Sequence, residues 1–284
     1  PIQQLAPASQ ILRRAAHAPA VRKAQGPQAE PPGGARRDSR QSFNCQYNRQ
    51  LMSLDLLVFG PHPDDLEIGL GGAIARHTAA GMRVGLCDLT VGELASNGTP
   101  AERVREADEA TRVLGAAWRE NLRWPDGGID ETPALIRSAV ELIRRHQPKT
   151  IAIPHGSDRH PDHAAASRVL TVAAFKSGLR RYDTGQPPWR ADWVCAYFIN
   201  DSTTPSFVID VSAFYERKRD ALACHGSQFT PPDAHGVPTR LTHSTFRQLI
   251  ESRDAQFGAL IGVAFAEGVV VSEPVERPTL LRYP

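Results

Sequence analysis

The stretch LDLLVFGPHPDD, residues 54–65, decides how the fold of this chain is interpreted. It starts with an apolar run that is typical of a buried strand and ends with residues that start turns and helices. The stretch TIAIPHGSDRHPDH, residues 150–163, repeats this pattern. Two such units predict a parallel sheet with both turns at its carboxyl edge, where these folds bind their ligands. We therefore expect the functional site at that edge.

The rest of the chain alternates strand-like apolar runs with amphipathic helical segments. The expected strands are 54–59, 82–89, 120–123, 150–154, 193–199 and 206–211. The expected helices are 67–80, 100–114, 132–146, 162–177, 212–224 and 241–258, with a polar loop over 226–240. The predicted fold class is α/β, a Rossmann-like parallel sheet flanked by helices, with the active site at the carboxyl edge of the strands.

Composition divides the chain into a basic extension and one folded domain. With 284 residues, 41% hydrophobic and 23% charged, the chain can bury one good core. Residues 1–51 carry a net charge of +6, and residues 52–284 carry a net charge of −4. The first segment is rich in Pro, Ala, Gln and Arg and has no sustained helical or strand period. We expect a disordered extension over 1–51 and a catalytic domain over 52–284.

Three interpretations of the extension stay open. Met52 directly precedes the first strand, which favours translation of the native protein from that residue. A natural disordered extension is the second interpretation. The third is a targeting or nucleic-acid-binding role for its arginines, which the lack of interleaved aromatic residues disfavours. We therefore expect no nucleic-acid partner.

Membrane and disulfide chemistry are not indicated. No stretch approaches the roughly 20 apolar residues that a membrane helix needs, and the opening PIQQ is unlike a signal peptide. The four cysteines are far apart and form no CxxC pair. We expect a cytoplasmic protein without a membrane partner.

The imidazole and carboxylate groups of the two turns match the ligands of a catalytic zinc ion. Such an ion takes three protein ligands at about 2.0–2.2 Å and keeps one position open for water. His62, Asp65 and His163 would form that set. Asp64 would then be the general base that takes a proton from the attacking water. The native metal stays open, because such a site also accepts iron(II), cobalt or manganese.

The second turn adds groups that would act on the substrate carbonyl. His160 would donate a hydrogen bond to the developing oxyanion as an imidazolium, and Asp162 would orient His160 or hold it protonated. The structural alternative is that Asp and Pro at these turns only start helices. Two His-Pro-Asp motifs in equivalent positions favour the metal site. Glu67 stays open between a hydrogen bond to a metal ligand and a purely helix-stabilising role.

These motifs resemble a known family, the zinc-dependent deacetylases of N-acetylglucosamine conjugates that include the PIG-L and LmbE-like proteins. Residues 60–72, GPHPDDLEIGLGG, are similar to its first motif, and residues 158–163, DRHPDH, to its second. Further segments resemble the branch that serves bacillithiol biosynthesis: 87–90, 93–99, 125–126, 207–210, 227–229, 257–258 and 265–268. The resemblance covers 54–281. It departs at Pro61, where the family carries alanine, and at His225-Gly226, where Tyr-Glu is usual.

The resemblance implies hydrolysis of the acetamide of N-acetyl-α-D-glucosaminyl L-malate, with one Zn²⁺ per subunit and a homo-oligomeric assembly. It also implies that Arg103 and Asp126 contact the sugar or its neighbouring group. Arg159 is a further candidate for binding this small glycoside, because guanidinium groups pair well with the malate carboxylates.

Two other functions stay open. One is the same hydrolysis on another N-acetylated sugar, such as a mycothiol precursor, a chitooligosaccharide or an antibiotic intermediate. Segments 90–99 and 227–229 favour the malate substrate over these. The other is a non-catalytic Rossmann-like binding protein, which the complete set of metal-ligating and acid/base residues disfavours.

Overall fold

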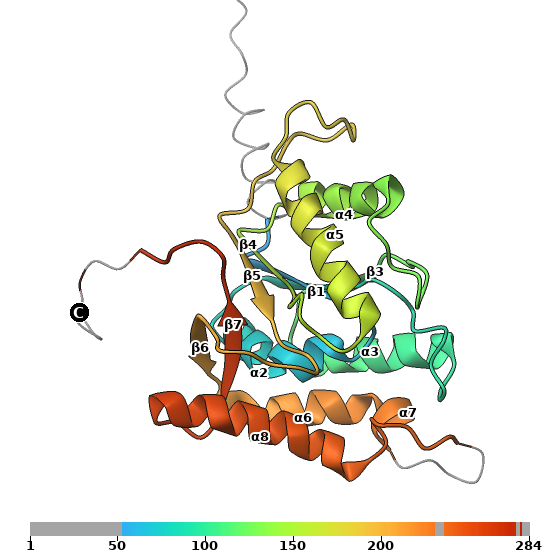
Figure 1. Ribbon diagram of the computed structural model, residues 1–284, viewed down its shortest axis with the longest axis vertical. Coiled ribbons are helices and arrows are strands. Elements are labelled where there is room, and N and C mark those ends of the chain that lie inside the picture. Colours follow the sequence, from blue (N-terminus) through green and yellow to red (C-terminus); the bar gives the residue numbers. More distant parts are fainter. Residues whose placement is uncertain (1–52, 231–235, 277–278, 280–284) are drawn as a thin grey trace, which may run out of the picture. The chain divides into compact units, whose positions relative to one another are not determined.

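The computed structural model of the chain describes residues 53–230, 236–276 and 279. The extension expected over 1–51 lies outside these residues, so that expectation stays a prediction. The described residues form one mixed sheet of seven strands in the order β3-β2-β1-β4-β5-β7-β6, with helices on both faces (Figure 1). No helix in these ranges is long and apolar enough to cross a membrane.

Five parallel strands form the body of the sheet. They are β1 (Leu56–Gly60), β2 (Val84–Asp88), β3 (Trp118–Asn121), β4 (Thr150–Pro154) and β5 (Trp193–Tyr197). In β1, Leu56 and Val58 belong to one hydrophobic core, and Leu57 and Phe59 to the other. Side chains of a strand alternate between the two faces, so an apolar run of this kind produces a sheet that is buried on both sides.

Helices cover the two faces in separate groups. Figure 1 shows α4 (Pro133–His146) and α5 (Pro161–Ser177) on one side of the sheet, and α2 (Asp65–Ala79) and α3 (Pro100–Leu114) on the other. The core below α2 and α3 also takes Ala221 and Leu222 from α6 (Tyr215–Cys224). This arrangement confirms the predicted α/β class with helices on both faces.

Local signals explain the bounds of α3. The Thr99 hydroxyl accepts a hydrogen bond from Glu102 N, and the Glu102 carboxylate accepts one from Thr99 N, which forms a capping box. The helix ends at Gly115, whose φ of 74° is left-handed. The predicted helix over 100–114 is therefore confirmed at both ends.

The far edge of the sheet differs from the prediction. β7 (Ala266–Val270) runs antiparallel to both β5 and β6 (Phe207–Asp210), so the sheet is not wholly parallel. The sequence analysis missed β7, because its short run contains a charged Glu267 and a glycine. That glutamate is nevertheless buried, since neighbouring elements supply its partners.

The segments before and after α6 also differ from the prediction. The expected helix over 212–224 divides into the short 3₁₀ helix η1 (Ser212–Phe214) and α6. The expected loop 226–240 begins with the short helix α7 (Gly226–Phe229), and the helix expected from 241 begins later, as α8 (Ser244–Ile261). The sequence from 212 to 243 has weak helical periodicity. Tertiary contacts therefore decide where η1, α6, α7 and α8 begin and end.

Candidate active site

Two turns at the carboxyl edge of the sheet carry the candidate site. β1 and β4 are parallel neighbours, so the turns that follow Gly60 and Pro154 lie side by side. Asp64 is the N-cap residue of α2, and His160 is the N-cap residue of α5. Asp64 has φ 124°, a conformation that a residue with a side chain adopts only at a steric cost. Such strain is often found at functional turns.

One carboxylate oxygen joins the two turns. Asp65 Oδ2 lies 3.2 Å from His62 Nδ1 and 3.3 Å from His163 Nε2, and it accepts a hydrogen bond from His62 N at 2.9 Å. Adjacent ligand atoms on a tetrahedral zinc ion are separated by a similar distance, about 3.4 Å, when each bond is about 2.1 Å. The fold thus brings Asp65 next to both His62 and His163 across nearly a hundred residues of chain. Among the described residues, these three do not form one of the groups whose donor atoms all lie within 4.8 Å of one another.

His163 is oriented by a residue to which the sequence analysis assigned no role. Asp158 Oδ1 lies 3.2 Å from His163 Nδ1, which leaves Nε2 to face Asp65. Burial lowers the pKa of His163, but Asp65 and Asp158 outweigh it and raise that pKa to about 9. Asp158 also accepts hydrogen bonds from His160 N and Asn200 N. The sequence signal that could have identified Asp158 is its position as the first residue of the DRHPDH motif.

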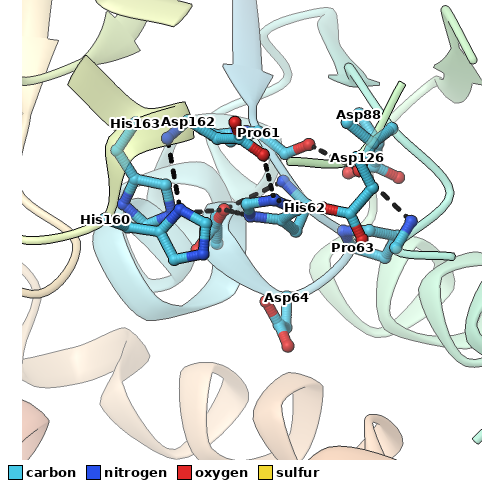
Figure 2. Close-up of polar contacts among 12 residues, drawn as sticks. Pro61, His62, Pro63, Asp64, Asp88, Asp126, His160, Asp162 and His163 are labelled. Carbon is cyan, nitrogen blue, oxygen red and sulfur yellow. Dashed lines mark hydrogen bonds and ion pairs between the residues drawn. The ribbon is translucent and has the colours of Figure 1, made fainter. Parts of the chain in front are cut away.

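His62 has carboxylate partners on its other ring nitrogen. Nε2 lies 3.1 Å from Asp126 Oδ1 and 3.2 Å from Asp162 Oδ2 (Figure 2). Nδ1 is therefore the atom left to face Asp65. Burial would raise the pKa of Asp126, but the His62 ring and the Leu94 N–H lower it to about 2. Carboxylates that orient metal-ligating histidines are a general feature of metal sites. Asp126, which was predicted to bind substrate, thus also orients His62.

The predicted role of Asp162 on His160 is wrong in one respect. The Asp162 carboxylate contacts His62 and Gly127 N, whereas its backbone N–H donates to His160 Nδ1 at 3.3 Å. Burial, His62 and His163 lower the pKa of His160, so the neutral ring is favoured over the imidazolium. Asp162 thus contacts His160 through its backbone N–H, while its carboxylate oxygen Oδ2 is directed to His62 and Gly127. The Nδ1 contact makes Nε2 the protonated nitrogen of a neutral ring.

Asp64 lies apart from the histidines and beside a guanidinium. Figure 2 shows it below the histidine group, and it lines the same cavity. Arg103 Nη2 donates to Asp64 Oδ2 at 3.2 Å and to Pro63 O at 2.6 Å. Burial raises the pKa of Asp64 to about 6, with a further increase from Asp65 and an opposing effect of Arg103. Arg103 was predicted to bind substrate, and its guanidinium is already bonded to this turn.

Glu67 belongs to a buried charged cluster below the turn. Arg119 donates to Glu67 Oε1 at 2.6 Å and to both carboxylate oxygens of Asp88 at 2.7 Å. His225 Nε2 lies 3.3 Å from Glu67 Oε2, although neither ring nitrogen has a hydrogen-bond partner among the described residues. Burial raises the pKa of Glu67, but Arg119 and His225 outweigh this effect and lower that pKa to about 2. Glu67 thus holds Arg119, and the described contacts do not connect it to a candidate metal ligand.

The two turns line a cavity. It is bounded by the two turns, by residues 94–96 and by the segment around Thr239 and Leu241. Arg159, which was predicted to bind substrate, lines this cavity and has no ion-pair partner in the described ranges. The members that carry polar or charged groups toward the site are His62, Asp64, Asp65, Arg103, Asp126, Arg159, His160, His163, Asn200 and Gln228. Of the site residues named from the sequence, all but Asp162 therefore line one cavity, and the Asp162 carboxylate is buried against His62.

A metal ion has more than one possible donor set here. In the described part of the chain, two groups have donor atoms within 4.8 Å of one another: His62, His160 and His163, and His62, Asp126 and Asp162. The three histidine rings lie close, with centroids 4.7 Å apart for His62 and His160 and for His160 and His163. Imidazole and carboxylate donors suit zinc and related divalent ions. A metal-binding group that includes His62 is therefore possible.

Fold and site together define a class, the α/β proteins with clustered histidine and carboxylate side chains at the carboxyl edge of a mainly parallel sheet. The family model PIG-L, GlcNAc-PI de-N-acetylase, matches residues 57–174. The 1D-myo-inositol 2-acetamido-2-deoxy-alpha-D-glucopyranoside deacetylase of Saccharomonospora viridis is 30% identical over 231 residues, which cover 62% of this chain and 85% of that protein. The diacetylchitobiose deacetylase of Thermococcus kodakarensis is 26% identical over 229 residues, covering 75% and 81%.

A solved structure is also similar to this chain. The conserved protein TT1542 from Thermus thermophilus is 38% identical, with a TM-score of 0.74, and the match covers 81% of this chain and 99% of that one. The chain belongs to the PIG-L family of deacetylases. The resemblance predicted from the two motifs is thereby confirmed at the level of the family.

Proposed function

We propose that this protein is a zinc-dependent hydrolase that removes the acetyl group from an N-acetylated amino sugar. The observation that carries the proposal is the shared Asp65 oxygen between His62 and His163, next to a buried, separate carboxylate on Asp64. One turn thus supplies both a metal ligand and a base. The family relatives, whose names describe deacetylases of N-acetylglucosamine conjugates, support the same chemistry.

In this proposal His62, Asp65 and His163 hold the metal. His62 Nδ1 and His163 Nε2 are the ring atoms that face Asp65, because carboxylates occupy the opposite nitrogens. The bound ion would polarise the attacking water and the acetamide carbonyl. Two imidazoles and one carboxylate fit zinc, and this choice of ligands leaves His160 free to contact the substrate.

Asp64 acts as the general base. Its pKa of about 6 leaves the carboxylate ionised at neutral pH yet basic enough to accept a proton from water. The protonated Asp64 then returns that proton to the nitrogen of the leaving amine. Arg103 holds the carboxylate in place through its 3.2 Å contact.

His160 stabilises the oxyanion as a neutral donor. The Asp162 N–H bonded to Nδ1 leaves the proton on Nε2, and the ring lines the cavity. A fixed N–H that meets charge developing on the carbonyl oxygen lowers the barrier without reorganisation of the site. This role replaces the imidazolium expected from the sequence.

The substrate that we propose is N-acetyl-α-D-glucosaminyl L-malate, as in bacillithiol biosynthesis. Arg159 supports an acidic aglycone, because it lines the cavity as a cation without an ion-pair partner in the described ranges. Asp126 and Arg103 would contact the sugar at the inner end. A cytoplasmic location and a homo-oligomeric assembly also stay proposals.

Acetate release tests the proposal. The zinc-loaded protein is compared on N-acetylglucosaminyl malate, on the inositol glycoside of N-acetylglucosamine and on diacetylchitobiose. A preference for the malate glycoside that falls in Arg159→Ala, with the other two substrates little changed, would support the acidic aglycone. Preference for a neutral substrate would refute the malate assignment, and no release from any of the three would refute sugar deacetylation.

A further inference from the structure

The helix that carries the metal-binding turn is broken in its middle. Leu70 in α2 has φ −134° and ψ 16°, outside the helical region. In a regular α-helix Gly72 N would donate to Ile68 O, four residues earlier. The break divides α2 into a first part that begins at Asp65 and a second part that ends at Ala79, and both contribute side chains to the same hydrophobic core.

Two side chains of opposite charge take the hydrogen bonds that the break releases. Glu267 accepts from Gly72 N at 2.9 Å and from Ala73 N at 2.7 Å. Arg253 Nη2 donates to Ile68 O at 2.7 Å. An anion therefore caps the amino end of the second part, and a cation caps the carboxyl end of the first part. Both charges match the helix dipole at these ends.

The two capping side chains are connected by a buried chain of charges. Arg253 Nε donates to Asp254 Oδ1 at 3.0 Å, and Lys218 Nζ donates to Asp254 Oδ2 at 2.6 Å and to Glu267 Oε1 at 2.7 Å. Lys218 and Asp254 are 0% exposed and Glu267 is 1% exposed. Burial of charges is costly unless each is paired, so this chain holds its members in one arrangement.

Close packing holds both parts of α2 against neighbouring elements. A Cβ on Gly69 would lie 2.2 Å from the Tyr197 ring, and one on Gly72 would lie 2.7 Å from Val211 Cβ. The two glycines let α2 approach β5 and the segment before α6. Arg253 Nη1 also donates to Ile199 O at 2.7 Å, which connects the first part of α2 to the segment that follows β5.

We propose that Arg253 and Glu267 are positioning residues that set the orientation of the metal-binding turn by holding the two parts of α2 at a fixed angle. The first part carries Asp65, follows directly after Asp64, and contributes Ile68 to the cavity wall. A shift of this part would move the ligand and the base together. The inference rests on the proposed function, because it assumes that this turn binds the metal.

Two double variants separate positioning from stability. Lys218→Met with Glu267→Met removes one buried positive and one buried negative charge, together with both acceptors that cap Gly72 and Ala73. The matched control, Lys218→Met with Asp254→Asn, also removes one charge of each sign but keeps both caps. Thermal unfolding, the affinity for Zn²⁺ in competition with a chelator, and kcat and KM for acetate release are measured for each.

We expect both variants to lose thermal stability, the first because Gly72 N and Ala73 N lose their acceptors and the control because the buried Glu267 carboxylate loses its Lys218 partner. Only the variant at Glu267 should bind Zn²⁺ about tenfold more weakly, as for other residues that orient metal ligands. Its kcat should fall about tenfold or more while KM changes less than about twofold, because the reacting groups and not the binding surface are displaced. Equal losses of Zn²⁺ affinity and kcat in the two variants would overturn the proposal.

A milder variant covers the case in which a double variant does not fold. Arg253→Lys keeps a positive charge beside Asp254 but lacks the planar fork that reaches both Ile68 O and Ile199 O. Weaker Zn²⁺ binding is expected, and unchanged Zn²⁺ affinity and kcat would contradict the proposal. The Zn²⁺ measurement needs no substrate. If the wild-type protein releases no acetate, the proposed function fails while the positioning role is still tested.

Discussion

Asp64 is a buried carboxylate with a strained backbone, a guanidinium neighbour and the proposed metal ligand Asp65 directly after it in the chain. These four properties decide its chemistry, because burial and the neighbouring Asp65 raise its pKa while Arg103 limits the increase. A carboxylate with this balance can accept a proton near neutral pH.

Replacement of the base should separate catalysis from metal binding. Asp64→Asn keeps the size of the side chain but removes the proton acceptor, so kcat should fall on the order of 10²–10⁴-fold. Bound zinc, measured by elemental analysis, should stay near one per chain. His163→Ala should lose both activity and zinc. Equal zinc loss in the two variants would show that Asp64 is a ligand.

The pH dependence follows from the ionisation of Asp64. The pKa is about 6 and the active form is ionised, so kcat/KM should rise with pH through about 6 and level off above it. Arg103 lowers this pKa, so Arg103→Met should move the rising limb to higher pH. The pH profiles of the two proteins provide the measurement. An unshifted limb in the variant would assign the titration to another group.

Asp158 should control metal affinity without ligating the metal. In Asp158→Asn the partner of His163 Nδ1 loses its charge, so affinity for Zn²⁺ should fall about 10–100-fold. Chelator competition measures this change. Asp192→Asn, at an exposed aspartate, is the control and should leave the affinity unchanged. The same affinity in both variants would remove Asp158 from this role.

At the scale of elements, helix starts and ends place the reacting groups. α3 starts at a capping box and presents Arg103 one turn later, whereas α5 starts at His160, whose ring faces the cavity. α2 is the exception, because side chains from β7 and α8 complete its hydrogen bonds. The orientation of the site thus depends on helix termini and on their caps.

The cap of α3 should contribute measurably to stability. Thr99→Ala removes the acceptor for Glu102 N and should lower the free energy of unfolding by about 1 kcal/mol. Denaturant unfolding measures the change. Arg105→Ala, at an exposed position of the same helix, should stay within about 0.5 kcal/mol of the wild type. A Thr99 effect as small as this control would show that the capping box contributes little.

At the scale of the whole molecule, the site joins two β-α units that are distant in the chain. A metal ion that binds ligands from both units binds the folded state better than the unfolded state. Zn²⁺ at 100 times its dissociation constant should stabilise the protein by about 2.7 kcal/mol. Thermal unfolding with and without the ion should show this increase. His163→Ala should remove most of it, and an equal increase in that variant would contradict the ligand set.

The sequence by itself determined the parallel core and most of the residues that line the candidate site. Apolar runs followed by His-Pro-Asp turns specify strand, turn and helix locally, and parallel neighbours must end at one edge, so His62, Asp64, Asp65, His160 and His163 could be placed together. The membership of the protein in the PIG-L family was predicted from the same motifs.

Only the tertiary structure decided which group each side chain contacts. Asp162 faces His62 instead of His160, Asp158 orients His163, and β7 inserts antiparallel between β5 and β6. The break in α2 is likewise completed by Glu267, almost two hundred residues away. Sequence patterns report local periodicity, whereas these contacts depend on long-range packing and on the pairing of buried charges, which no local pattern specifies.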